Sequence, residues 1–151
     1  MFKNKKSYDY FESFHLFSAY ALEAAQYLDE VINDYDIEKL PEQMDKMHVI
    51  ENNCDIHHHA VNAELLSEFL PAISAEDILM LNDRLDNVVD TIEDILIGIY
   101  TFNVLNIRSQ AIMFSNIIVR LAEALHEATE DFKQFKTSKT IIEKLKVVKR
   151  L

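Results

Sequence analysis

The residues of this sequence that are best suited to chemistry are acidic side chains at helical spacing. Glu51, Asp55 and His58 are separated by four and three positions, so on a helix their side chains share one narrow face. That face overlaps the apolar side of the segment, where a charge is costly unless it is paired or binds a metal ion. The spacing fits either a metal site or a polar cluster paired across a helix–helix seam, and spacing alone favours the polar cluster.

A second acidic group follows on the side of the next segment that faces away from its main apolar stripe, where only Arg84 offsets the negative charge. Like charges at these spacings repel each other, and a bound hard cation such as Mg²⁺ or Ca²⁺ would turn that repulsion into affinity. Spacing alone favours a solvated acidic face without an ion. The group consists of Asp83, Asp86, Asp90, Glu93 and Asp94.

The sequence offers no nucleophile paired with a base. Cys54 lies on the apolar side of its segment, so we expect it to be a core residue. The three histidines at 57–59 would point in three directions on a helix, and only His58 shares the face of Glu51. The sequence has no glycine-rich phosphate loop, CxxC pair or HExxH motif, and no Glu-x-x-His pair of the di-iron type lies beside either acidic group.

Apolar residues recur at steps of three and four along most of the chain, which predicts five amphipathic helices. We expect Pro41 in the first turn of the second helix and Ser74 as the N-cap of the third. One glycine and two prolines are too few for a sheet with tight turns. Short loops make neighbouring helices antiparallel, so we expect an all-α antiparallel bundle in one domain, residues 1–151. The expected helices cover residues 8–35, 41–70, 75–102, about 110–135, and 139 onward.

The same periodicity predicts which side chains face the core. In the second helix the expected stripe ends at Phe69. In the third helix it comprises Ile78, Leu81, Leu85, Val88, Ile92, Ile95 and Ile99. In the fourth helix it comprises Phe114, Ile118, Leu121, Leu125, Ala128 and Phe132.

Charge is unevenly distributed along the chain. Residues 7–132 carry five basic and 25 acidic side chains, a net charge of −20, and the other ten basic residues lie at the two ends. An acidic body repels nucleic acid and attracts cations or basic partners, although it also simply favours solubility. From the single cysteine and the absence of a secretory signal or bilayer-length apolar run, we expect a cytoplasmic protein. The basic C-terminal segment suits a helix C-terminus and also contact with anionic lipid or a transporter.

Four segments occur in the order and spacing of a known family. They are Lys5-Lys6 and Tyr8-Asp9-Tyr10-Phe11 before an alanine-rich helix, Ile50-Glu51-Asn52-Asn53-Cys54-Asp55 with a Glu-x-x-x-Asp motif, Phe69-Leu70-Pro71-Ala72-Ile73 followed by Glu76-Asp77-Ile78, and Leu85-Asp86-Asn87-Val88-Val89-Asp90-Thr91-Ile92-Glu93. Together they resemble the PhoU-like phosphate transport regulators, specifically the short accessory proteins often paired with an inorganic phosphate transporter. The resemblance covers nearly the whole chain.

The resemblance implies a bundle of three-helix repeats, with the second repeat incomplete in this chain. It implies surface metal clusters of iron, zinc or another divalent cation, with Glu51, Asp55, Asp86 and Asp90 as ligands. Asn87 stands where the family often has a second aspartate. It also implies a regulatory role in phosphate uptake without catalysis. The implied partner is a phosphate transporter or phosphate-sensing protein. Peripheral membrane contact through the transporter and homo-oligomerisation are both compatible with the resemblance.

Two other classes of function remain open. One is a metal-storage protein or metal-dependent enzyme built on a helical bundle, and the other is a helical interaction module without metal. The metal content of protein purified without chelator separates the regulator from the metal-free module.

Overall fold

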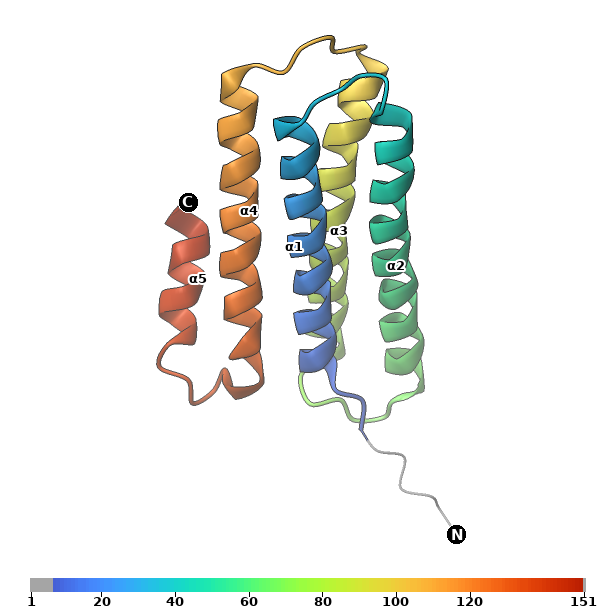
Figure 1. Cartoon of the computed structure of the whole chain (residues 1–151). Helices are drawn as coiled ribbons and strands as arrows, with labels where there is room; N and C mark the ends of the chain where they lie inside the picture. The colour runs from blue at the N-terminus through green and yellow to red at the C-terminus, as the bar shows by residue number, and fades with distance from the viewer. Residues whose placement is uncertain (1–6, 151) are drawn as a thin grey trace.

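Residues 7–150, which the computed structural model describes, form five α-helices and one 3-10 turn (Figure 1). No strand occurs in this part of the chain, so the predicted all-α fold is confirmed. Within the same residues, no helix combines the length and the apolar character needed to cross a membrane. Lys5 and Lys6, from the first segment of the family resemblance, lie outside the described residues. The elements are α1 (Tyr10–Asn33), α2 (Leu40–Ser67), α3 (Ala75–Thr101), α4 (Ser109–Glu130), η1 (Phe132–Gln134) and α5 (Ile141–Arg150).

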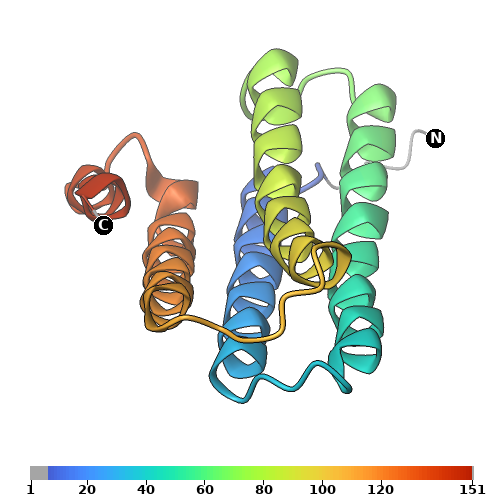
Figure 2. The ribbon, with the colours of Figure 1, turned by 90° about the horizontal axis from the view of Figure 1, so that it is seen from above.

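Helix α1 lies at the centre of the bundle and packs against α2, α3 and α4. Figure 2 shows α1 between the α2–α3 pair and α4, with α5 on the far side of α4. Phe14, Phe17 and Leu28 of α1 are fully buried and form much of the core. Ser18 and Ala21 are also buried, and their small side chains let neighbouring helices approach closely.

The predicted helix ends are confirmed to within about five residues, and the start signals act as expected. Pro41 lies in the first turn of α2, and the hydroxyl of Ser74 accepts a hydrogen bond from the Asp77 amide at 3.1 Å. The Asp77 carboxylate accepts from the Ser74 hydroxyl at 2.7 Å instead of from its backbone amide. Helix α2 ends at Ser67, so Phe69 lies beyond it and is 93% exposed; its predicted inward position is wrong.

Helix α3 is buried on two sides because it packs against both α1 and α2. Leu85 and Ile92 of the predicted stripe are buried, but Val89 and Leu96, which the prediction leaves out, are buried as well. Asn82 belongs to this second side, since its amide donates to the His58 carbonyl of α2 at 3.1 Å. The side of α3 that faces α2 therefore includes positions that a single stripe assigns to solvent.

The most deeply buried side chains of helix α4, which packs against α1, are small or polar. Ser115, Ala122 and Thr129 are buried, whereas Phe114 is 64% exposed, so the predicted inward position of Phe114 is wrong. The hydroxyl of Ser115 donates to Asp29 of α1 at 2.5 Å. Elsewhere in the predicted stripe, Ala128 is buried, and Ile118, Leu125 and Phe132 are half-buried against the core.

A stacked pair of histidines belongs to the same α1–α4 interface. The rings of His15 and His126 are nearly parallel, with centroids 4.2 Å apart. Ser18 Oγ lies 2.9 Å from His126 Nδ1, and Thr129 Oγ1 lies 3.0 Å from His15 Nδ1. Burial, and after it the neighbouring His15, lowers the pKa of His126 below its ordinary value of 6.5, with Glu130 acting in the opposite direction.

We expect the protein to lose stability as the pH falls from about 7.5 to about 5.5. The pKa of His126 is lower in the folded chain than in the unfolded chain, so the unfolded chain binds more protons as the pH falls through 6.5. His57, whose pKa burial also lowers, contributes in the same direction. His126→Gln should lower the stability at pH 8 by about 1 kcal/mol, because a buried polar contact is altered.

The same variant should show a smaller loss of Tm on acidification than the wild type, because it lacks one of the two histidines whose pKa burial lowers. Thermal melts followed by circular dichroism in the presence of chelator measure how Tm changes with pH for the variant and for the wild type. Equal slopes for the two proteins would contradict this assignment.

Candidate metal centre

Acidic and histidine side chains of α2 and α3 meet where these two helices pack against each other. Most of them come from the two acidic groups of the sequence, and all four predicted metal ligands are among them. We call this set the carboxylate–histidine seam. It consists of His48, Glu51, Asp55, His58 and His59 of α2 and Asp83, Asp86, Asp90 and Glu93 of α3.

At one end of the seam, His48 stands between carboxylates of both helices. Its Nδ1 lies 3.0 Å from Glu93 Oε1 and 3.2 Å from Glu51 Oε2. One donor atom from each of the three residues lies within 4.8 Å of the others. The His48 side chain is 67% exposed, while those of Glu51 and Glu93 are 19% and 15% exposed, so an ion can reach largely covered carboxylates from the solvent.

At the other end, both ring nitrogens of His58 face carboxylates of α3. Nε2 lies 2.9 Å from Asp83 Oδ1, and Nδ1 lies 3.7 Å from Asp86 Oδ2. His59 Nε2 lies 3.4 Å from Asp55 Oδ1 on the same helix. Asp55, His58 and His59 form a second set of three donor atoms within 4.8 Å of one another.

The prediction that the three consecutive histidines point in three directions holds for His57 alone, because the ring centroids of His58 and His59 are 5.6 Å apart. His57 turns towards α1, where its ring centroid lies 4.7 Å from that of Phe17. The turn of α2 that carries His58 is held by Asn82, whose amide donates to the His58 carbonyl and, at 2.9 Å, to Asn62 Oδ1. Asn62 Nδ2 lies 3.3 Å from His58 Nε2. Polar contacts of this kind fix the orientation of a histidine relative to its neighbours.

The four residues that the family resemblance implies as ligands all lie in the seam. The charges of Asp90 and Asp55 act on Glu51, and those of Asp86 and Asp55 act on Asp90. The expected outward position of Asp86 and Asp90 is wrong, since the Asp86 side chain is only 13% exposed and Asp90 is half-buried. The reason is the second buried side of α3, which turns both carboxylates towards α2. Arg84 instead lines a cavity beside α4.

The seam carries an unbalanced negative charge. In residues 7–150, no lysine or arginine forms an ion pair with a carboxylate of the seam. Burial, and after it Glu93, raises the pKa of Glu51, while burial followed by Asp86 raises the pKa of Asp90. The fold holds these carboxylates together at a cost in free energy, and a bound cation would offset that cost.

Cys54 borders the seam and is fully buried, which confirms its predicted core position. Its Sγ lies 3.6 Å from Asp86 Oδ1. Burial, and after it the charge of Asp86, raises the pKa of the thiol far above its ordinary value. Because the thiolate is the reactive form, Cys54 is a poor nucleophile at neutral pH.

Sequence reasoning does not single out His48 or His59 as donors. His48 gains its role from Glu93, which lies on another helix, and periodicity within one helix does not report such pairs. The available signals are the i, i+3 spacing of His48 and Glu51 and the i, i+4 spacing of Asp55 and His59.

No protein-family model matches the chain, and no curated protein matches it. The resemblance to the PhoU-like family therefore rests on the four sequence segments alone.

The donor set of the seam fits a divalent transition-metal ion. Imidazole nitrogen together with carboxylate oxygen suits zinc, iron and related ions, whereas magnesium and calcium prefer oxygen alone. Each set of three donors combines at least one histidine with at least one carboxylate. The presence of histidine at both ends of the seam makes zinc or iron better suited than magnesium or calcium.

We expect Asp90→Asn to stabilise the metal-free protein, because it removes a half-buried charge that Asp86 and Glu93 repel. A gain of about 1 kcal/mol would raise Tm by about 2–4 °C. The pKa of Asp90 is raised in the folded chain above 3.8, so the contribution of this group to stability falls as the pH rises through the acidic range, and the variant lacks that contribution. The difference in Tm between the two proteins should thus grow from pH 4 to pH 7.

Glu123→Gln is the matched control, since it removes the same charge from an exposed position on α4. Melts of all three proteins in chelator provide the measurement. A lower Tm for Asp90→Asn than for the wild type would show that the seam is stabilising without an ion, against this interpretation.

Proposed function

We propose that this chain is a cytoplasmic accessory protein that regulates inorganic phosphate uptake, binds a divalent transition-metal ion in the carboxylate–histidine seam, and acts by contact with a phosphate transporter or phosphate-sensing protein. The metal part of the proposal is supported by the geometry of the seam. The phosphate part is supported by the order and spacing of the sequence segments that resemble PhoU-like regulators.

The observation that carries the metal proposal is the position of His48 between Glu51 and Glu93. Two largely covered carboxylates from different helices meet one accessible imidazole, and no basic side chain of the described residues balances them. The bound ion would supply positive charge at this point. His48 Nδ1 and one oxygen from each glutamate would hold it, while Asp86 and Asp90 would add negative charge further along the seam.

A regulatory role without catalysis is favoured by the chemistry next to the seam. Cys54 borders the seam, and its thiol stays protonated at neutral pH because burial, and after it the charge of Asp86, raises its pKa. Side chains that hold an ion between two helices can instead stabilise one arrangement of those helices, which a partner protein can recognise.

The second candidate is a metal-storage protein or a metal-dependent enzyme. The exposure of the His48 side chain favours it, because an ion held there would keep coordination positions open to the solvent. A storage protein would take up many ions per chain, whereas the proposed regulator binds only as many as its donor sets hold.

Metal analysis and thermal melts test the metal proposal on the wild type and on Asp86→Ala/Asp90→Ala. We expect stoichiometric zinc or iron in wild-type protein purified without chelator. Adding the ion to metal-free protein at about 100 times its Kd should stabilise the fold by about 2.7 kcal/mol, or about 5–10 °C in Tm. His48→Ala should lose both effects because it removes a proposed ligand, and the double variant should bind the ion more weakly because it removes negative charge further along the seam.

The matched control is Glu123→Ala/Glu127→Ala, which removes two exposed carboxylates at the same i, i+4 spacing from α4. It should bind metal as the wild type does. Wild-type protein that holds no metal, and whose melt ignores zinc, iron, manganese and magnesium, would overturn the metal proposal and favour a metal-free interaction module.

Phosphate uptake by cells that naturally carry the gene tests the regulatory proposal. Deleting the gene should change the initial rate of radiolabelled phosphate uptake, and the wild-type chain should restore it. The His48→Ala chain should not restore the rate, while the α4 control variant should. An uptake rate that does not respond to the deletion would reject the phosphate role while leaving the metal measurement unaffected.

A further inference from the structure

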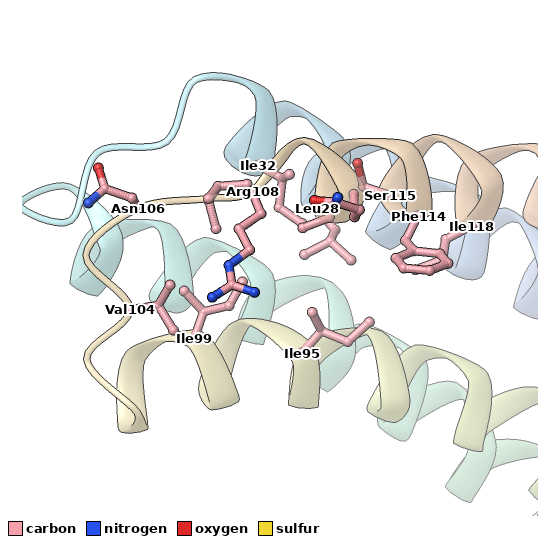
Figure 3. A pocket seen from close by; sticks show the side chains of 13 residues that line it. Leu28, Ile32, Ile95, Ile99, Val104, Asn106, Arg108, Phe114, Ser115 and Ile118 are labelled. Carbon is pink, nitrogen blue, oxygen red and sulfur yellow. The ribbon is translucent and has the colours of Figure 1, made fainter.

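An elongated apolar groove lies between α3 and α4, which both pack against α1 but hardly against each other. Two cavities of about 630 and 430 Å³ adjoin here and share Ile95 and Ile118, and Val148 of α5 also lines the smaller one. Figure 3 shows the larger cavity, with Ile95 of α3 and Phe114 of α4 on opposite walls. Leu28 and Ile32 of α1 also line this cavity.

The groove differs in charge from the rest of this acidic protein. No aspartate or glutamate lines either cavity, although residues 7–132 carry 25 of them. Arg108 lines one cavity and Arg84 the other, and Figure 3 shows the Arg108 guanidinium extending into the open space. Neither arginine forms an ion pair within the described part of the chain. The groove is thus apolar along its length, with an unbalanced positive charge at each end.

Helix α4 directs its large apolar side chains to this groove. Phe114, Ile118, Leu121 and Leu125 all line it, and all belong to the stripe that periodicity assigns to the core. Small and polar residues attach α4 to α1, so this stripe is left only partly covered. An amphipathic helix with an incompletely covered apolar face gains free energy when another apolar face packs on it.

We propose that the groove between α3 and α4 binds an amphipathic helix of a partner protein, and that this helix carries an acidic side chain near each end of its apolar stripe. Arg84 and Ile99, which lies beside Arg108, are 15 positions apart on α3 and therefore about 22 Å apart. The bound helix spans about four turns. Apolar contacts supply affinity, and the two arginines fix its position along the groove.

Charge distinguishes this occupant from two others. An acyl chain has one charged head group, so it would leave one of the two arginines without a partner. A second copy of this chain would offer α5, whose apolar Ile142 and Leu145 are exposed. The lysines beside them, such as Lys146 and Lys149, would then lie against the arginines of the groove. Acidic residues on a separate helix avoid both problems.

The test uses the full chain and a designed helical peptide of about 20 residues. The peptide has one apolar stripe and a glutamate at each end of it, about four turns apart, and a second peptide has lysines at those two positions. Fluorescence anisotropy measures the Kd of each peptide. The salt concentration is about 0.15 M, because a lower ionic strength would exaggerate electrostatic contacts with the acidic surface. We expect the glutamate peptide to bind at least tenfold more tightly than the lysine peptide.

Arg84→Glu/Arg108→Glu should reverse that preference, because both ends of the groove change sign. Both arginines are exposed, so the variant tests binding with little risk to folding. Arg120→Glu is the matched control, since Arg120 is an exposed arginine on α4 outside the groove. It should keep the preference of the wild type.

Three results would overturn the proposal. The first is that neither peptide binds, or that both bind equally to the wild type and to the double variant. The second is self-association in analytical ultracentrifugation that Phe114→Glu abolishes, which would assign the groove to a second copy of the chain. The third is competition by a fluorescent fatty acid whose binding requires Arg108 alone.

Discussion

Helix α1 packs against three long helices at once, and this constraint determines where the other features of the protein lie. Its small side chains, among them Ser18 and Ala21, let neighbours approach closely, while Phe14 and Phe17 fill the core. The α2–α3 pair occupies one part of its surface and α4 another. Because α3 and α4 both pack against α1 and hardly against each other, a groove remains between them. The direct contact of α2 with α3 brings the polar side chains of these two helices together.

Helix α3 separates two surfaces of opposite electrostatic character. Its acidic residues at positions 86, 90 and 93 face α2, and the residues that follow two of them, Asn87 and Thr91, line the groove towards α4. The 100° rotation per residue of an α-helix is enough to move from one surface to the other. Arg84 belongs to the groove side, so it does not neutralise the nearby carboxylates of Asp83 and Asp86. Separating the charges in this way costs stability at the seam and leaves positive charge available in the groove.

Helical periodicity predicts the helices of this fold well, but it predicts less well which side of each helix is buried. Caps and breakers such as Pro41 and Ser74 act locally, so the helix boundaries can be read from the sequence. The side that a helix buries depends on how many neighbours it has, which explains why Val89 and Leu96 escape a single-stripe prediction. The acidic positions of the candidate site can be named from their spacing within one helix. The contact between His48 and Glu93 depends on the register of two helices, so spacing within one helix cannot predict it.

The two surfaces should respond differently to solution conditions, because different interactions govern them. Glu51, Asp86 and Glu93 of the seam are largely covered, so screening by salt affects them weakly, while pH changes the charge of the seam through the raised pKa values of Glu51 and Asp90. The groove depends on apolar area, which salt strengthens slightly, and on two exposed arginines, whose attraction salt screens. Arginine does not titrate near neutral pH. A property that follows pH and chelator therefore belongs to the seam, and one that follows ionic strength at constant pH belongs to the groove.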